Sequence, residues 1–220
     1  MKKLLPFAIL VVLAPAFSCS DNDEPTEVPG SGNIVTETRT VANFNSVKLL
    51  GPGLLAIDRS GAETLEITAD ENLMQFITSE VSNGQLMIGI EDAINALPTV
   101  PVIYKLTVDE LVEIMSVGNS AIEALDVAAD SFTVFLSGNG RITVGGAVLY
   151  QLVTLTASGT YEAWQLESAV ARVSVRNTNF AGVSVSDTLF AQVLECGRID
   201  YIGDPVVFKD VSECGTVGRR

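Results

Sequence analysis

FTVFLSGNGRITV (Phe132–Val144) places one apolar strand on each side of a corner rich in glycine and asparagine. Related corners return along the second half of the chain at offsets of 20, 19, 19, 19 and 18 residues. A unit this short cannot bury its own apolar face and must stack on its neighbours, so the repeat predicts a solenoid. The six corners are Gly118–Ile122, Gly138–Ile142, Ala157–Tyr161, Arg176–Phe180, Glu195–Ile199 and Glu213–Val217.

We therefore predict an all-β fold, a parallel β-helix or related β-solenoid with repeats of about 19 residues. In this alignment Asn119, Asn139 and Asn177 share one column, where stacked amides can hydrogen-bond from one coil to the next. A calcium-binding array of turns needs several aspartates in each turn, and these corners lack them. The column therefore indicates a structural role.

The repeats belong to one predicted domain over residues 30–220, in which 106–220 forms the regular coils. The hairpin-rich part, 30–105, is expected to cap one end of the stack, because an uncapped end exposes unpaired strand edges. Asn83-Gly84 is a strong signal for a two-residue hairpin turn within this part.

One stretch of the N-terminal part departs from the strand pattern. Leu73, Phe76 and Ile77 recur at helical spacing, and Asp70 precedes them at a distance that suits a helix cap. We predict a short helix or helical turn within residues 70–80, packed against the core rather than forming a binding stripe.

The first eighteen residues resemble an export signal. Lys2 and Lys3 precede the apolar run Leu4–Leu13, which is too short to span a bilayer permanently. Ser18 then precedes Cys19, as at the cleavage site of a bacterial lipoprotein, which predicts a signal peptide over 1–18 and a lipid on Cys19. Ordinary signal-peptidase cleavage nearby is the alternative.

Residues 19–29 are acidic and interrupted by prolines, so we predict a disordered tether. An acidic cluster directly after a lipidated cysteine resembles the surface-export signal of some outer-membrane lipoproteins. A plain solvated linker is the alternative. Together these segments predict an exported outer-membrane lipoprotein, exposed at the cell surface, with the membrane as a partner through its lipid.

Acidic residues outnumber basic residues 27 to 13, and the chain has no histidine. A formal net charge of −14 argues against a nucleic-acid partner, which would need a basic face. The absence of histidine removes the usual proton shuttle and the commonest zinc ligand. The carboxylates form no recognisable catalytic motif, so we predict a protein that is not an enzyme and that needs no metal or cofactor.

Two cysteines remain if Cys19 is lipidated, and Cys196 and Cys214 occupy one column of neighbouring repeats. On adjacent strands their Cα atoms are expected about 4.8 Å apart, within the range for a disulfide. An exported protein meets oxidising conditions, which permit the bond. A pair of reduced thiols packed as small apolar groups is the alternative.

Three aromatic side chains are candidates for a ligand surface: Tyr150, Tyr161 and Trp164. Aromatic rings can stack on the faces of sugars, so a cluster of them would indicate a glycan site. Large aromatics also fill the core or the corners of a fold, which is the alternative interpretation.

Several of these motifs occur in an order that resembles a known family. The chain opens with Gly30–Asn33, continues with Val41-x-x-Phe44-x-x-Val47 and Gly51-Pro52, then Asp70–Leu73, and ends in the glycine repeat over 116–217. This order is similar to the "head GIN domain" family of adhesin-like bacterial proteins. The resemblance covers essentially the whole chain after the tether, and it implies an all-β solenoid on an exported protein.

We therefore predict a non-enzymatic surface protein that acts as an adhesin or structural component. Its expected partner is a glycan or a protein on a host or neighbouring cell. Two alternatives stay open, a glycan-binding or glycan-degrading β-helix and a module that assembles into homo-oligomers.

Overall fold

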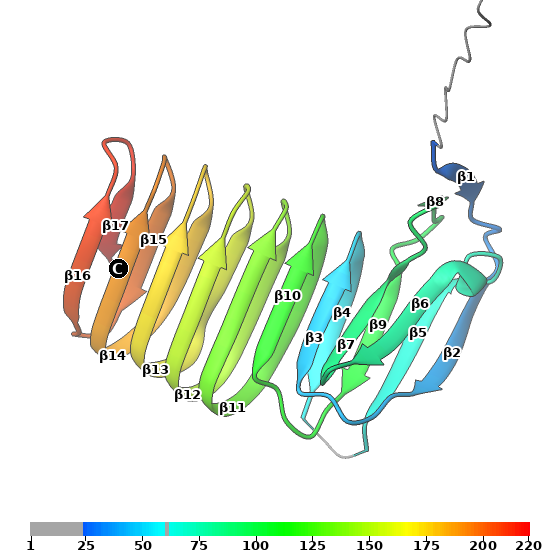
Figure 1. Cartoon of the computed structure of the whole chain (residues 1–220), viewed down its shortest axis with the longest axis horizontal. Coiled ribbons are helices and arrows are strands. Elements are labelled where there is room, and N and C mark those ends of the chain that lie inside the picture. The colour runs from blue at the N-terminus through cyan, green and yellow to red at the C-terminus, as the bar shows by residue number, and fades with distance from the viewer. Residues whose placement is uncertain (1–23, 60–61) are drawn as a thin grey trace, which may run out of the picture.

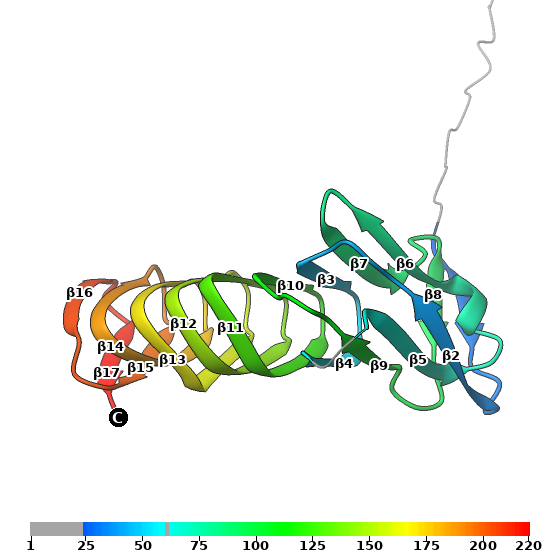
Figure 2. The same cartoon turned by 90° about the horizontal axis from the view of Figure 1, so that it is seen from below.

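The computed structural model describes residues 24–59 and 62–220 as an elongated all-β molecule (Figure 1). Its strands wind into a flattened coil in which two layers enclose a continuous apolar core (Figure 2). The predicted β-solenoid is confirmed. The predicted signal peptide, 1–18, and the predicted lipidation site, Cys19, lie outside the described residues. Within the described ranges, no helix is long and apolar enough to cross a membrane.

Four long strands form the regular coils, and each bends so that it contributes to both layers. Ala121, in the first half of such a strand, pairs with Leu54 and Arg141, whereas Thr133, in the second half, pairs with Glu113 and Leu152. The pairing between coils is parallel throughout. The long strands are β11 (Ser120–Ser137), β12 (Arg141–Leu155), β13 (Thr160–Val175) and β14 (Phe180–Val193).

We call the two layers sheet A and sheet B; each contains one half of every long strand. The other strands of sheet A are β6 (Ile77–Ser82), β7 (Gln85–Ile90), β3 (Ser46–Leu50), β10 (Glu113–Val117) and, at the far end, β16 (Val206–Val211). The other strands of sheet B are β2 (Ile34–Thr40), β5 (Thr64–Asp70), β9 (Ile103–Thr107), β4 (Gly53–Asp58), β15 (Arg198–Ile202) and β17 (Thr216–Arg219).

The core is built from the inward residues of both sheets, which stack in columns from coil to coil because strand side chains alternate between two faces. In sheet A, Val134, Val153 and Val173 form one such column, and each is almost fully buried. Buried polar groups are paired as well: Gln151 donates from Nε2 to Ser168 Oγ at 2.7 Å. Among the described side chains, no buried nitrogen or oxygen lacks a hydrogen-bond partner.

Short corners lead from sheet A to sheet B, and the strand pairing after them corrects the repeat spacing. One column of sheet B just after the corners contains Ala121, Arg141, Thr160, Phe180, Arg198 and Thr216, so the offsets are 20, 19, 20, 18 and 18. The sequence alignment had placed the fourth corner one residue too early.

This shift makes the predicted asparagine ladder wrong. Asn177 has a φ of 51° and lies in the column of Gly118 and Gly138, while Asn119 and Asn139 are exposed one column further on. Asn177 still ties its corner to the preceding coil, because its Nδ2 donates to the Thr156 carbonyl at 3.1 Å. A second tie comes from the buried Asn179. It accepts a hydrogen bond from the Gly159 amide at 2.6 Å and donates one to the Ala157 carbonyl at 2.7 Å.

Antiparallel strands close the N-terminal end of the coil. In sheet B, β2 pairs with β5 and β5 with β9, and in sheet A β6 and β7 form a hairpin, so the last strands of both sheets at this end are antiparallel (Figure 2). Asn83 and Gly84, with φ of 52° and 77°, form the two-residue turn between β6 and β7. That hairpin prediction is confirmed.

The helix prediction is confirmed only as a single 3₁₀ turn, Met74–Phe76. Asp70 does not cap it, because its carboxylate is occupied elsewhere. The carboxylate is fully buried and accepts hydrogen bonds from the Gly32 amide (2.7 Å), the Thr99 amide (2.9 Å) and the Thr99 hydroxyl (2.8 Å). Asp70 thus joins the end of β5 to the segment before β2 and to the loop at residue 99.

This carboxylate predicts an acid-sensitive step in stability. Burial raises the pKa of Asp70, but the hydrogen bonds from Thr99 and Gly32 outweigh it and hold the pKa below its ordinary value. A lowered native pKa stabilises the fold at pH values above the unfolded pKa, and that contribution is lost as the pH falls through the native pKa. We expect Asp70→Asn to lower the melting temperature at pH 7. The difference from wild type should shrink below about pH 4. Thermal melts from pH 7 to pH 2 measure this, and a constant difference would contradict the account.

The prediction of a disordered tether over 19–29 is wrong for its last four residues. Strand β1 (Thr26–Pro29) pairs in parallel with β8 (Ile94–Leu97). The Thr26 amide donates to the Ala93 carbonyl at 2.8 Å, and the Gly30 amide donates to the Leu97 carbonyl at 2.9 Å. Composition alone could not reveal this strand, because its partner lies almost seventy residues further along the chain.

Candidate functional site

The three aromatic residues singled out from the sequence do not form one patch. Tyr161 is fully buried, since it pairs with Ile142 and Ala181 at an inward position of sheet B. Its hydroxyl lies 3.2 Å from Gln151 Oε1, to which it donates, and burial raises the pKa of the phenol. The prediction that Tyr161 belongs to a ligand surface is therefore wrong.

Trp164 and Tyr150 lie on different sides of the molecule. The indole of Trp164 covers Gly182 on the outer face of sheet B and packs against Phe180, with ring centroids 6.2 Å apart. Tyr150 lies at the start of the sheet A half of β12, where its hydroxyl is 3.4 Å from Arg172 Nε. Trp164 therefore serves local packing, whereas Tyr150 contacts the surface of sheet A.

The outer face of sheet B carries charges that are already paired. Arg141 Nη1 lies 2.7 Å from Glu162 Oε2, and Lys105 Nζ lies 3.0 Å from Glu66 Oε1. Near the far end Arg198 and Asp200 form a bidentate pair, with nitrogen–oxygen distances of 2.8 and 2.6 Å. These internal partners leave few charged groups free to bind a ligand.

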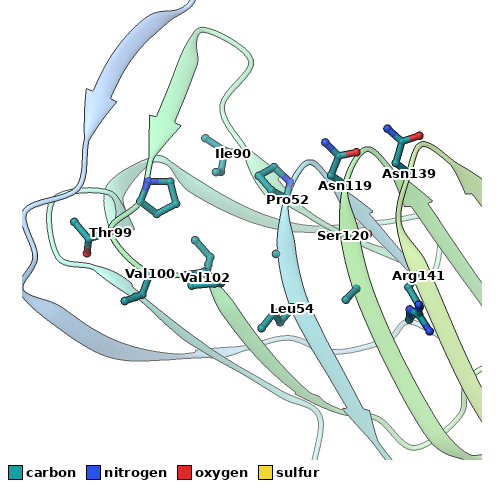
Figure 3. Close-up of a pocket in the computed structure, with 14 residues that line it drawn as sticks. Pro52, Leu54, Ile90, Thr99, Val100, Val102, Asn119, Ser120, Asn139 and Arg141 are labelled. Atoms are coloured by element: carbon teal, nitrogen blue, oxygen red, sulfur yellow. The ribbon is translucent and has the colours of Figure 1, made fainter. Parts of the chain in front are cut away.

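A concave pocket lies where the N-terminal part meets the first coils on this side (Figure 3). This junction pocket encloses about 540 Å³ and is lined largely by apolar groups, including Leu54 and Val100, which are 43% and 41% exposed. Asn119 and Asn139 lie side by side at its rim, at the tips of neighbouring corners. Because Arg141 is already paired with Glu162, the pocket offers two amides but no free charge.

The outer face of sheet A differs in kind. Its two central outward columns together place an apolar side chain on most strands, with polar and charged residues such as Lys48, Glu113 and Arg172 between them. No ion pair lies on this face among the described residues. Most of the apolar side chains are half-buried, and Phe208 is 56% exposed. We call this set the apolar band: Met87, Met115, Phe135, Leu152, Phe190 and Phe208.

At the C-terminal end of the apolar band, three flat groups stack along the coil axis. The Arg172 guanidinium carbon lies 4.7 Å from the centre of the Phe190 ring, and the Phe190 and Phe208 rings lie 5.2 Å apart and nearly parallel, at 13°. They come from β13, β14 and β16, which are successive strands of sheet A. Sequence reasoning missed the two phenylalanines, although both stand at outward positions and are one repeat, 18 residues, apart.

A groove runs beside this stack and encloses about 430 Å³. The stack forms one wall, and a row of polar side chains in the next outward column forms the other: Thr154, Ser174, Gln192 and Asp210. Ser174 Oγ lies 3.1 Å from Gln192 Oε1, and Gln192 Nε2 donates to Asp210 Oδ2 at 3.3 Å. The groove therefore combines an apolar wall, an ordered polar row and one cation.

Cys196 and Cys214 lie on neighbouring corners, as the sequence predicted, with Cα atoms 4.7 Å apart and sulfurs in bonding contact. We expect the protein to contain this disulfide under oxidising conditions. Denatured, non-reduced protein should then show no reactive thiol from this pair, whereas reduction should release two. A thiol assay that finds both groups reactive before reduction would contradict the bond.

The winding of two sheets around one core defines a β-solenoid that presents two long, dissimilar faces. The chain belongs to the family described as "Putative auto-transporter adhesin, head GIN domain", whose model matches residues 43–205. The resemblance inferred from the sequence is thereby confirmed. No protein with a curated description matches the chain.

Solved structures share the fold. A "putative adhesin" from Bacteroides fragilis is 17% identical, with a TM-score of 0.68 over 87% of this chain and 98% of that one. A "putative adhesin" from Parabacteroides merdae is 20% identical, with a TM-score of 0.57 over 88% and 99%. A "putative lipid binding protein" from Parabacteroides distasonis is also 20% identical, with a TM-score of 0.54 over 89% and 100%. At these identities the likeness shows the fold alone.

Proposed function

We propose that this protein is an exported, lipid-anchored, non-enzymatic adhesin that binds its target through the outer face of sheet A. Membership of an adhesin family supports the general role. We assign binding to the outer face of sheet A because of the apolar band, since apolar surface that is rimmed by polar groups marks interaction sites. The paired charges on sheet B make that face a weaker candidate.

The arrangement of the ends supports an anchor near the N-terminus. Strand β1 lies at the capped end of the coil, and β16 and β17 lie at the opposite end (Figure 1). A lipid on Cys19 would hold the capped end at the membrane and direct the C-terminal end of the apolar band outward. From β7 to β16 sheet A has eight strands, so the band extends roughly 34 Å. Incorporation of an alkyne fatty acid by wild type, and its loss in Cys19→Ala, tests the anchor.

The proposal of a non-enzymatic role rests on the make-up of the groove. Asp210 is the single carboxylate among the described residues that line it. Hydrolysis of a glycoside ordinarily uses two carboxylates on either side of the scissile bond. A glycan that lies in this groove would therefore be held without a second acid or base.

Bead adhesion under flow tests the binding face. Beads coated with the full chain should be retained on immobilised mucin or on an extracellular-matrix mixture. Phe135→Lys with Leu152→Lys places two charges in the apolar band, and we expect retention to fall at least tenfold. Thr143→Lys with Thr160→Lys is the matched control, because both threonines point outward from sheet B. Equal retention of the two double variants would overturn the assignment to sheet A.

A further inference from the structure

We propose that the groove beside Arg172, Phe190 and Phe208 binds a short oligosaccharide that carries one carboxylate. This inference rests on the proposed function and names the ligand class of the same face. The sugar carboxylate would pair with Arg172, and the ring next to it would lie against the phenylalanines.

Arg172 is prepared to receive an anion. Its side chain is held in place by contacts on two sides, since Nε lies 3.4 Å from the Tyr150 hydroxyl and the guanidinium lies over the Phe190 ring. Both contacts leave Nη1 and Nη2 free: neither makes a hydrogen bond to any residue in the described ranges. A guanidinium with two free parallel donors matches the geometry of a carboxylate.

The phenylalanine wall suits the apolar face of a sugar ring. Phe190 and Phe208 stack in register on β14 and β16, so together they present a continuous apolar surface. β16 is the last strand of sheet A, since among the described residues it pairs with β14 alone, and Phe208 is exposed there. The C–H groups of a pyranose ring can pack on such a surface while its hydroxyls stay hydrated.

The opposite wall suits the hydroxyl groups. Thr154, Ser174, Gln192 and Asp210 stand on four successive strands, so their polar ends follow one another at intervals of about 4.8 Å. Hydroxyl, amide and carboxylate groups in one row can both donate to and accept from a ligand with many hydroxyls. The chain of hydrogen bonds from Ser174 to Asp210 fixes their orientation before a ligand arrives.

The charge balance favours one carboxylate rather than a polyanion. The whole chain has a formal net charge of −14, which repels a ligand with many negative groups. Of the charged residues that line the groove, Lys209 stands at an inward position of β16, and the Asp210 carboxylate already accepts a hydrogen bond from Gln192. Arg172 is therefore the cation that faces a ligand on the outer side of sheet A. At physiological salt the screening length is about 8 Å, so this nearby charge acts more strongly on a small ligand than the distant net charge does. The groove volume also lies in the range of small-ligand sites.

An extended peptide is the competing occupant, and the backbone disfavours it within the groove. Peptides commonly bind β-proteins by pairing with a free strand edge. β13 and β14, which form most of the groove floor, are paired on both sides, and β16 alone has a free edge. Side-chain groups rather than main-chain groups therefore line the groove.

Calorimetry on the full chain, purified in a mild detergent, tests the proposal with two trisaccharide probes that each carry one carboxylate, sialyllactose and a glucuronate-containing trisaccharide. The methyl esters of both are the ligand controls. We expect at least one acid to bind about tenfold more tightly than its ester.

Arg172→Gln should reduce the affinity for the acid to that for the ester, while Arg176→Gln, which removes the same charge from the next corner, should not. Phe208→Ala should weaken both forms several-fold, and Val206→Ala, at an equally exposed site on β16, should not.

Three results would overturn the proposal: equal binding of acid and ester, no saccharide binding by a chain that still mediates bead retention, or binding of unstructured peptides that Arg172→Gln abolishes. The failure of the proposed function looks different. In that case bead retention would be insensitive to the two lysine substitutions in the apolar band, whatever the calorimetry shows. Which of the two acids binds would identify the source of the carboxylate.

Discussion

Replacing Gly138 by alanine should lower the stability of the protein more than any change to an exposed corner residue. Gly138 has a φ of 144°, and a Cβ atom there would lie only 2.0 Å from the Gly118 carbonyl oxygen of the preceding coil. The coils must therefore separate, or the backbone must change its conformation. We expect a loss of about 3 kcal/mol or more, and a fall in melting temperature of roughly 6–12 °C.

The neighbouring position is the control for this prediction. Asn139 is exposed at the same corner, so Asn139→Ala should change the free energy of unfolding by less than about 0.5 kcal/mol. Thermal and denaturant unfolding measure both variants. If Gly138→Ala were as stable as wild type, the close stacking of these corners would be wrong.

Replacing Lys209 by valine should convert a monomer into a self-associating protein. β16 is the edge strand of sheet A, and Lys209 pairs with the buried Ala191, so it occupies an inward position of the last coil. Beside it the terminal coil is open, with half-buried Val211 and Val217 around a cavity of about 480 Å³. An inward charge on an edge strand is a known means of preventing edge-to-edge association. Valine would complete an apolar end and allow two chains to pair.

Light scattering in a Cys19→Ala background, which lacks the proposed lipid, measures this change. We expect wild type to remain monomeric and Lys209→Val to approach twice the monomer mass with rising concentration. Lys48→Val makes the same substitution at an outward position in the middle of sheet A, where no strand edge is free, and should leave the mass unchanged. A monomeric Lys209→Val protein would contradict the role given to this lysine. A wild-type dimer would favour the self-assembling module that the sequence left open.

The repeat made the fold predictable because every unit of a solenoid has the same local pattern of strand, corner and strand. Apolar strands on both sides of a glycine corner specify the coil, and the Asn83-Gly84 turn specifies its hairpin without knowledge of any distant residue. Register was harder to predict, since the fourth corner has Asn179 where the neighbouring corners have Gly159 and Gly197. The resulting one-residue error placed Asn177 in the wrong column. The pairing of β1 with β8 and the bonds of Asp70 join distant segments, which leave no local pattern.

The candidate site depends on which face each side chain takes, and this explains why sequence reasoning included the buried Tyr161 and missed Phe190 and Phe208. Tyr161 and Phe190 both stand in apolar strands, yet Tyr161 points into the core and Phe190 points out of it. Arg172 gave no signal of its own, because its place in the groove follows from phenylalanines one and two coils away. The cysteine pair was found readily, because both residues occupy one corner column.

Hydroxyl-radical footprinting of the full chain bound to a mucin-coated surface tests most directly whether sheet A is the binding face. The apolar band contains oxidisable side chains along its length, among them Met87, Met115 and Phe190, and Trp164 reports on sheet B. The account predicts that binding protects the methionines and phenylalanines of the band and leaves the oxidation of Trp164 unchanged. Protection of Trp164 with no protection of the band would contradict it.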